Sequence, residues 1–139
     1  MASMIGSKVE RKEDKKFLTG KGRYTADINL HNQLHAVFIR SPHARAKIKG
    51  IDTSKAKKAA GVVDVLTGKD MQDDKIGGLI AGWKIVSKDG TDMKCPAHPP
   101  LATDSVNYVG DHIALVVAET LQEAKDAADL VKVDYKVLK

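Results

Sequence analysis

The sequence predicts an α+β fold in which two similar units, each a hairpin followed by a helix and a strand, pack as one mixed core. The chain has 139 residues, which suits a single domain with one modest core. Alternation of apolar and polar residues, typical of half-buried strands, occurs within residues 34–66 and again within residues 106–138. Because strand, helix and strand signals follow the same order in both ranges, we expect the two units to pair with each other.

The amino-terminal residues predict an extended basic arm. Residues 1–16 are polar and charged and show no sustained apolar period. Such a segment is ordered only where another part of a protein holds it. We therefore divide the chain into an arm of residues 1–16 and a folded domain of residues 17–139.

A hairpin is predicted to open the first unit. Residues 34–39 are apolar and β-prone, and residues 44–49 alternate between apolar and basic side chains. Between them Ser41, Pro42 and His43 favour a turn, because proline presets φ and cannot donate to a central ladder. The two runs should therefore pair with each other.

A short helix and a strand complete the first unit. Residues 52–54 offer N-cap side chains, residues 55–60 favour a helix, and Gly61 can adopt the left-handed conformation that ends it. Strand character resumes in residues 62–66. The range 67–105 follows with glycines, prolines and little periodicity, which predicts a long connection with at most short strands.

The second unit repeats this order with clearer signals. Residues 106–109 and 112–118 predict a second hairpin around Gly110 and Asp111, and the second run is so apolar that we expect burial on both faces.

A capped helix and a final strand follow this hairpin. Thr120 and Glu123 have the spacing of a capping box. An apolar stripe of helical period continues over residues 121–131. Residues 131–137 then alternate as a half-buried strand.

The charge balance leaves an alternative function open. The net charge is +5, and the basic excess lies mainly in residues 8–21 and 45–58. A solvated surface explains this excess, but so does a basic binding or adaptor module for an acidic protein or nucleic acid. Aromatic residues make up only 4% of the chain, which leaves few rings for base stacking and disfavours nucleic acid.

The sequence contains no signal for a membrane or for secretion. The apolar run 113–118 is far shorter than the roughly 20 residues that span a bilayer, and the first thirty residues are charged rather than apolar. The single cysteine, Cys95, cannot form an internal disulfide, which fits a reducing compartment. We therefore expect a cytoplasmic protein.

Motifs for nucleotide, metal and nucleophile chemistry are incomplete. The glycines around Lys21 and the Gly68-Lys69 pair both depart from phosphate-binding patterns. Cys95 and His98 are spaced as two metal ligands or as a nucleophile and its base, but a structural zinc needs four ligands. We expect no catalytic, cofactor-binding or metal residue here, and a small hydrolase using Cys95 and His98 is a further alternative.

An ordered set of short segments extends through most of residues 5–138. The segments are residues 17–24, 27–28, 34–35, 40–44, 51–53, 61–63, 66–68, 101–102, 108–110, 114–120, 124, 127–128 and 133–135. In this order they resemble the amino-terminal domain of the molybdopterin-binding large subunit in the xanthine dehydrogenase and aldehyde oxidase family. The pattern is closer to aerobic carbon monoxide dehydrogenase-like large chains than to animal enzymes.

This resemblance implies an α/β hammerhead domain with a structural and assembly role. In the family, the hammerhead precedes a larger portion that binds the molybdenum cofactor and carries the catalytic glutamate. The complete oxidoreductase complex is therefore expected to contain molybdopterin with molybdenum, iron–sulfur clusters and FAD, none of them bound by residues of this chain. Its partners are expected to be the rest of the large subunit and an iron–sulfur subunit.

Two candidate contact segments follow from the resemblance. The first is a candidate contact with the iron–sulfur subunit, and its residues are Gly20, Gly22, Arg23, Tyr24 and Asp27. The second is a loop expected to approach the substrate channel, and its residues are Gly78, Leu79 and Trp83. A glycine-rich turn and a buried Trp83 explain the same residues without a contact. Residues 71–98 match the family least, so the substrate stays open.

Overall fold

The computed structural model describes residues 6 and 8–138, which fall into two compact units. The first unit ends at Gln33 and the second begins at Leu34. Residues 1–5 and 7 of the predicted arm lie outside the described residues. The last residues of the predicted arm are helical rather than extended, because helix α1 (Asp14–Leu18) begins within the arm. The division at residue 16 stays a prediction.

The first unit consists of two short helical turns. Helix α1 ends at Leu18, and Gly20 follows it with a left-handed φ of 69° and an N–H that donates to the Phe17 carbonyl at 3.1 Å. The second turn is the 3-10 helix η1 (Thr25–Asp27). Both turns leave their side chains exposed or half-buried, so this unit has no buried core of its own among the described residues.

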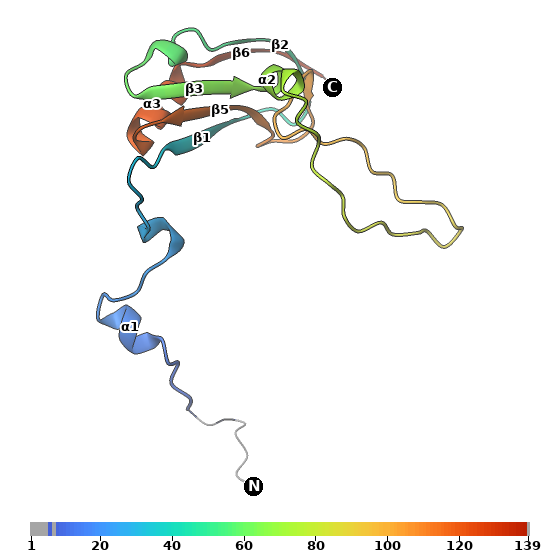
Figure 1. Ribbon diagram of the computed structural model, residues 1–139. Helices are drawn as coiled ribbons and strands as arrows, with labels where there is room; N and C mark the ends of the chain where they lie inside the picture. Colours follow the sequence, from blue (N-terminus) through green and yellow to red (C-terminus); the bar gives the residue numbers. More distant parts are fainter. Residues whose placement is uncertain (1–5, 7, 139) are drawn as a thin grey trace. The chain divides into compact units, whose positions relative to one another are not determined.

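The second unit is built from two three-stranded antiparallel sheets. The β5 sheet has the order β1 (His35–Arg40), β5 (His112–Ala118), β3 (Val62–Thr67). The β2 sheet has the order β4 (Ser105–Val106), β2 (Ala46–Asp52), β6 (Lys132–Val137). Figure 1 shows the sheets as separate layers, with β2 and β6 above β3, β5 and β1. The predicted α+β class is thereby confirmed.

The strands form where the sequence places them, but both predicted hairpins are wrong. Strands β1 and β2 lie in different sheets, and so do β4 and β5. The turn at Ser41 does not fold β2 back on β1; instead its backbone N–H donates to the Asp111 carbonyl at 2.8 Å. Every strand pair thus joins the first predicted unit to the second, which confirms that the two units pair with each other.

The inner face of the β5 sheet packs on helix α3 (Leu121–Leu130) and the 3-10 helix η2 (Ala56–Lys58). The buried members of this cluster are Ala56, Val65, Val116, Ala118, Ala124 and Ala127. The capping box is confirmed, since the backbone N–H and Oγ1 of Thr120 donate to Glu123 Oε2 at 3.0 and 2.7 Å. Gly61 has the predicted left-handed φ, at 71°. Small side chains on α3 allow it to approach the sheet closely.

A second apolar cluster lies on the inner face of the β2 sheet. Its buried members are Ala46, Ala102, Val106 and Ile113, with Ile48, Ile51, Val133 and Tyr135 packed against them. Ile113 belongs to β5, and it reaches this cluster at the point where the register between β1 and β5 shifts. Strand β5 therefore contributes to both clusters, but the predicted burial on both of its faces is only partly confirmed, because Leu115 and Val117 are half-buried.

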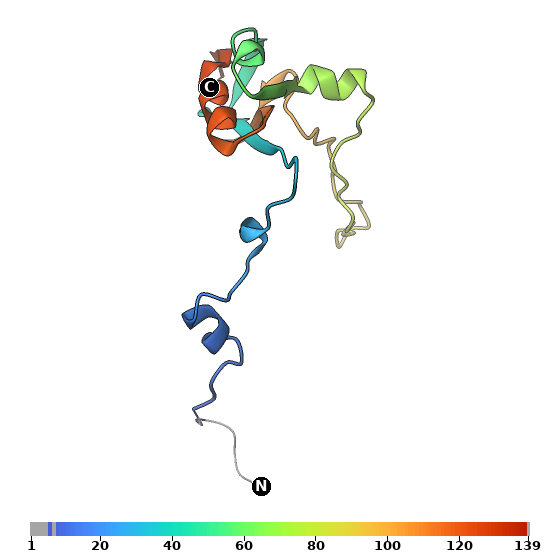
Figure 2. The ribbon, with the colours of Figure 1, turned by 60° about the vertical axis from the view of Figure 1, so that its left-hand side comes forward.

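The connection between the sheets differs from its prediction at its start. Residues 68–73 form helix α2 (Gly68–Asp73), so the expectation of at most short strands in this range is wrong there. The backbone N–H and Oγ1 of Thr67 donate to Asp70 Oδ2 at 2.7 and 2.6 Å. This capping box stabilises the first turn, and the hydrogen bond from Thr67 holds the pKa of Asp70 below its usual value. Figure 2 shows the chain leaving the sheets after α2.

Candidate subunit-contact segments

The segment of residues 20–27 is organised around two aromatic rings. The rings of Phe17 and Tyr24 stack with centroids 5.3 Å apart. Gly22 lies against the Phe17 ring so closely that a Cβ there would collide with it. The backbone N–H of Tyr24 donates to Asp27 Oδ2 at 2.8 Å. The structure thus brings Gly22, Tyr24 and Asp27 together, and the Phe17 ring, which sequence reasoning did not select, completes the group.

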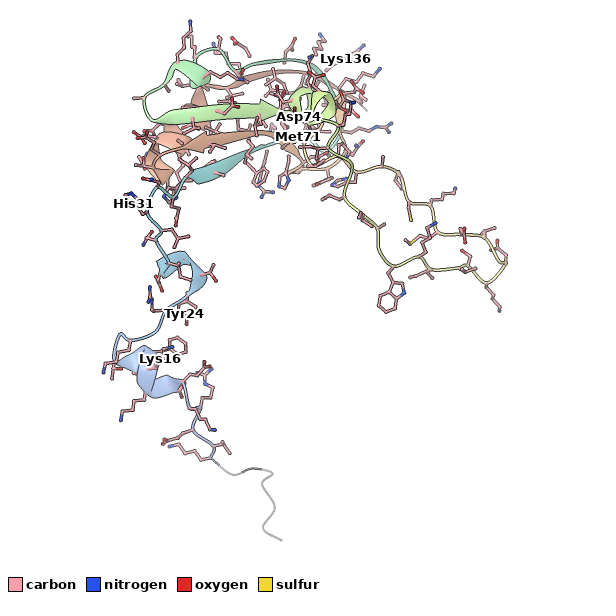
Figure 3. All side chains as sticks on the ribbon, in the orientation of Figure 1. Lys16, Tyr24, His31, Met71, Asp74 and Lys136 are labelled. Atoms are coloured by element: carbon pink, nitrogen blue, oxygen red, sulfur yellow. The ribbon has the colours of Figure 1, made fainter. Side chains whose placement is uncertain are left out.

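The remaining predicted residues of this segment have simpler roles. Gly20 supplies the left-handed residue that ends α1, and Arg23 is exposed. The Tyr24 side chain is 65% exposed although it stacks on Phe17, and Figure 3 labels it in the first unit. A hollow of about 400 Å³ beside the rings includes Arg11, Asp14 and Leu18. A preorganised ring with a polar rim is a common feature of protein interfaces.

Residues 75–99, here named the ribbon, run out and back as two extended segments. Leu79 N–H donates to the His98 carbonyl at 2.7 Å, and Met93 N–H donates to the Ile85 carbonyl at 3.0 Å. The tip closes at residues 87–91, where Asp89 Oδ1 accepts hydrogen bonds from the Thr91 backbone N–H and Oγ1. Figure 3 labels Met71 and Asp74 near the point where the ribbon leaves the sheets. Its backbone hydrogen bonds make the ribbon a defined element.

The ribbon exposes an unusual amount of apolar surface. Trp83 is 83% exposed and Ile80 is 92% exposed. The other large exposed apolar side chains of the ribbon are Ile76, Leu79, Ile85 and Val86. The alternative of a buried Trp83 is therefore wrong for this chain. Several large apolar side chains exposed on one element are a feature of sites that contact another molecule.

Gly78 and Leu79 fix the base of the ribbon. The position a Cβ would take at Gly78 lies 3.0 Å from the His98 carbonyl oxygen, so a side chain there would press on the facing segment. Leu79 makes the neighbouring backbone hydrogen bond. Of the candidate channel-side residues, these two shape the ribbon and Trp83 lies exposed farther along it.

Cys95 and His98 also lie on the ribbon, with different partners. The Cys95 thiol donates to the Met93 carbonyl at 3.5 Å. The His98 ring lies 6.3 Å from the Tyr108 ring, centroid to centroid. Within residues 6 and 8–138, no group of three or more His, Cys, Asp or Glu side chains is placed to hold a metal ion. None of the helices in this range is long and apolar enough to cross a membrane.

A buried polar corner joins the two sheets, and sequence reasoning missed its carboxylate. Asp111 is buried, and its Oδ2 accepts the backbone N–H of Asn107 at 3.0 Å. Ser41 is buried beside it, and its Oγ bonds the backbone of His43. Partial burial raises the pKa of the Tyr135 phenol, whose ring meets His43 edge-on. These contacts hold the chain where it passes from one sheet to the other.

Two packed antiparallel sheets, each assembled from strands of both halves of the chain, define an α/β hammerhead domain. Residues 19–139 match the family described as aldehyde oxidase and xanthine dehydrogenase, a/b hammerhead domain. The chain belongs to this family of oxidoreductases, as its motifs indicated.

Known members of the family resemble nearly the whole chain. The nicotine 6-hydroxylase large subunit of Paenarthrobacter nicotinovorans is 43% identical over 136 residues, which are 98% of this chain and 16% of that subunit. The carbon monoxide dehydrogenase large chain of Afipia carboxidovorans is 38% identical over 96% of this chain and 15% of its own length. The crystal structure of quinoline 2-oxidoreductase from Pseudomonas putida 86 has a TM-score of 0.83 and 36% identity, covering 96% of this chain and 16% of that one.

The chain spans only 15% to 16% of the length of these three proteins. Two of the relatives are named as large subunits or large chains, and a third relative is named as subunit gamma of a dehydrogenase complex. A domain of this family therefore occurs as a small part of large polypeptides that assemble with other subunits.

Proposed function

We propose that this chain is the packing and assembly domain of the large subunit of a molybdenum-dependent oxidoreductase. The observation that carries the proposal is the match of 96% to 98% of the chain to 15% or 16% of two large subunits. A solved relative is named as a copper- and molybdenum-containing carbon monoxide dehydrogenase. In this proposal, the portion outside residues 1–139 holds molybdopterin, while iron–sulfur and flavin groups carry electrons away.

The residues of this chain would contribute position rather than chemistry. The Phe17 and Tyr24 rings, with Gly22 and Asp27, form the proposed contact with the iron–sulfur subunit. Because the Tyr24 ring is already stacked and its backbone is already bonded, little conformational freedom remains to be lost on binding. This preorganisation supports a contact role for the segment.

The ribbon is the proposed channel-side element. Its apolar side chains, Trp83 foremost, are too exposed to stabilise the isolated domain. In the proposal they become buried against the cofactor-binding portion beside the substrate channel. The ribbon's extended backbone, which is hydrogen-bonded at both ends, would deliver these side chains to a site beyond the sheets.

Purification from the source cells tests the proposal. An antibody raised against residues 8–138 would be used to isolate the native protein under mild conditions. We expect the antigen either on a polypeptide much larger than the chain's 15.0 kDa or in a complex with one, with molybdenum and iron detected by elemental mass spectrometry. A 15-kDa antigen free of molybdenum and of any larger partner would contradict the proposal.

A further inference from the structure

The outer face of the β5 sheet carries an apolar patch that no helix of its own unit covers. Alternation along the paired strands separates two sides of this sheet. The side facing α3 and η2 carries Val37, Val116 and Val65 in one row. The opposite side carries Phe38, Leu115 and Leu66 in one row and Ala36 and Val117 in the next. We name these five residues the outer patch.

The outer patch is accessible and its centre is free of charge. Phe38 is 44% exposed and Ala36 is exposed, while Leu66, Leu115 and Val117 are half-buried. Polar side chains lie at its rim: Arg40 and His112 follow the first row, and Asp64 stands beside Val117 in the second row, where it pairs with Lys57. The His112 ring stacks on Phe38 at 4.4 Å, centroid to centroid. An apolar centre with a polar rim is the composition of a protein interface.

The edge beside the outer patch lacks the usual protection against pairing. Edge strands in proteins normally carry charged residues that discourage another strand from adding to the sheet. The edge strand β6 has Lys132, Asp134 and Lys136, and the edge strand β3 has Asp64. Strand β1 is also an edge of its sheet, but it has no Lys, Arg, Asp or Glu before its last residue, Arg40. The uncharged edge and the outer patch lie side by side.

From these observations we infer that the outer patch and the β1 edge dock on the portion of the large subunit that lies outside residues 1–139. The inference rests on the proposed function and says which surface serves it. The matched region is only 16% and 15% of the two large subunits that this chain resembles, so in the proposal the much longer remainder of such a subunit is present at one copy per domain. A polyanion does not fit the patch, because its centre is apolar and the basic side chains at its rim are few: Arg40 lies at one end, and Lys57 at the other is paired with Asp64 at 3.3 Å.

Thiol labelling distinguishes a covered face from a free one. Phe38→Cys and Ala36→Cys would be made separately, in the free chain and in the native assembly from the source cells. Lys136→Cys, on the outer face of the β2 sheet, is the matched control. Maleimide labelling at each site would be read by peptide mass spectrometry, which separates it from labelling of Cys95. Ala36→Cys keeps the test open if Phe38→Cys folds poorly.

We expect both patch variants to be labelled readily in the free chain. In the assembly their labelling should be slower by a factor of about ten or more, because a covered thiol reacts only when the contact opens. The Lys136→Cys control should be labelled equally in both. Unchanged labelling of the patch in a molybdenum-containing assembly would overturn the inference alone. If the Lys136→Cys control were protected to the same degree, the assignment of the contact to the outer face of the β5 sheet would be overturned. Protection in the free chain, with a dimer in sedimentation, would assign the patch to a second copy. Absence of any assembly would overturn the proposed function and this inference with it.

Discussion

The two sheets of the second unit have the same number of strands and similar inner faces, but their outer faces differ. The outer side of the β2 sheet presents Lys47, Asp52, Lys132, Asp134 and Lys136. The outer side of the β5 sheet presents Phe38, Leu66, Leu115, Val117 and Ala36. Charged side chains at this density remain hydrated, whereas the transfer of aliphatic and aromatic side chains out of water is favourable. The contrast assigns the β2 sheet to solvent and the β5 sheet to a partner.

The inner faces join the sheets into one structure through a single strand. Strand β5 is central in its own sheet, and its Ile113 is fully buried in the cluster of the other sheet. We therefore expect the two sheets to unfold together, although their outer faces differ in composition.

The largest expected effect comes from Ile113→Ala. Deleting this fully buried side chain should lower the free energy of unfolding by about 3 kcal/mol, because it removes apolar contacts and leaves a cavity. Urea unfolding followed by circular dichroism measures the loss. The control is Ile80→Ala on the ribbon, where 92% exposure predicts a change below about 0.5 kcal/mol. If hydrogen exchange shows only one sheet losing protection, the two sheets are independent and the comparison fails.

A smaller effect is expected from Thr120→Ala, which removes the N-cap of α3. The loss should be about 1 kcal/mol, because Thr120 Oγ1 accepts the Glu123 backbone N–H at 3.2 Å and no other described side chain replaces it there. Thermal unfolding would be compared with that of Lys125→Ala, an exposed change on the same helix that leaves the cap intact. Because α3 covers the β5 sheet, exchange should rise first in that sheet. An effect confined to the β2 sheet would contradict this packing.

The capping box of α2 should make stability depend on pH. The pKa of Asp70 is lowered from 3.8 in the folded chain, chiefly by the Thr67 side-chain hydrogen bond. Its stabilisation is therefore complete above pH 3.8 and is lost as the pH falls through the lowered folded value. Asp70→Asn should cost at most about 1 kcal/mol at neutral pH, and the difference from the native chain should shrink in acid. Asp73→Asn, which removes an exposed ion pair with Lys69, is the control. A difference that grows toward acid would contradict the assignment.

The smallest effect on stability is expected for Phe38→Ser in the free chain. The ring is already half exposed, so the free energy of unfolding should change by less than about 1 kcal/mol. Binding of a hydrophobic dye should fall, because the centre of the outer patch is lost. Lys136→Ser on the other sheet should leave dye binding unchanged. A cost above about 2 kcal/mol would show that Phe38 belongs to the core and would remove the contrast between the sheets.

Local signals in the sequence predicted where the helices and strands lie better than they predicted which strands pair. Alternation and capping chemistry are properties of a few adjacent residues, so the strands, the Thr120 capping box and the Gly61 turn were predictable. Partner choice is different, because β1 pairs with β5 rather than with β2 for reasons that lie far along the chain. Helix α2 was missed although Thr67 and Asp70 carry its signal, because its six residues are too few to show an apolar period.

The candidate contact segments were predictable only in part. Resemblance pointed to residues 20–27, but the stacking of Tyr24 on Phe17 depends on a turn that brings the residue before η1 back onto α1. Trp83 could be expected inside or outside a core, since a large aromatic suits both. The buried Asp111 lacked a signal, because its partners are backbone groups that every residue possesses.

The pairing of every strand with a strand of the opposite half also determines when this domain can form during synthesis. Arg40, at the end of β1, meets the Gly110 carbonyl 70 residues farther along the chain. Contacts this distant in sequence slow folding, because the chain loses loop entropy before any strand pairs. Until β5 has been synthesised, β1 waits with no partner and no charge before Arg40 to deter other nascent chains. The interval between the synthesis of β1 and that of β5 is therefore when this domain is most prone to aggregate, and when a chaperone would assist it most.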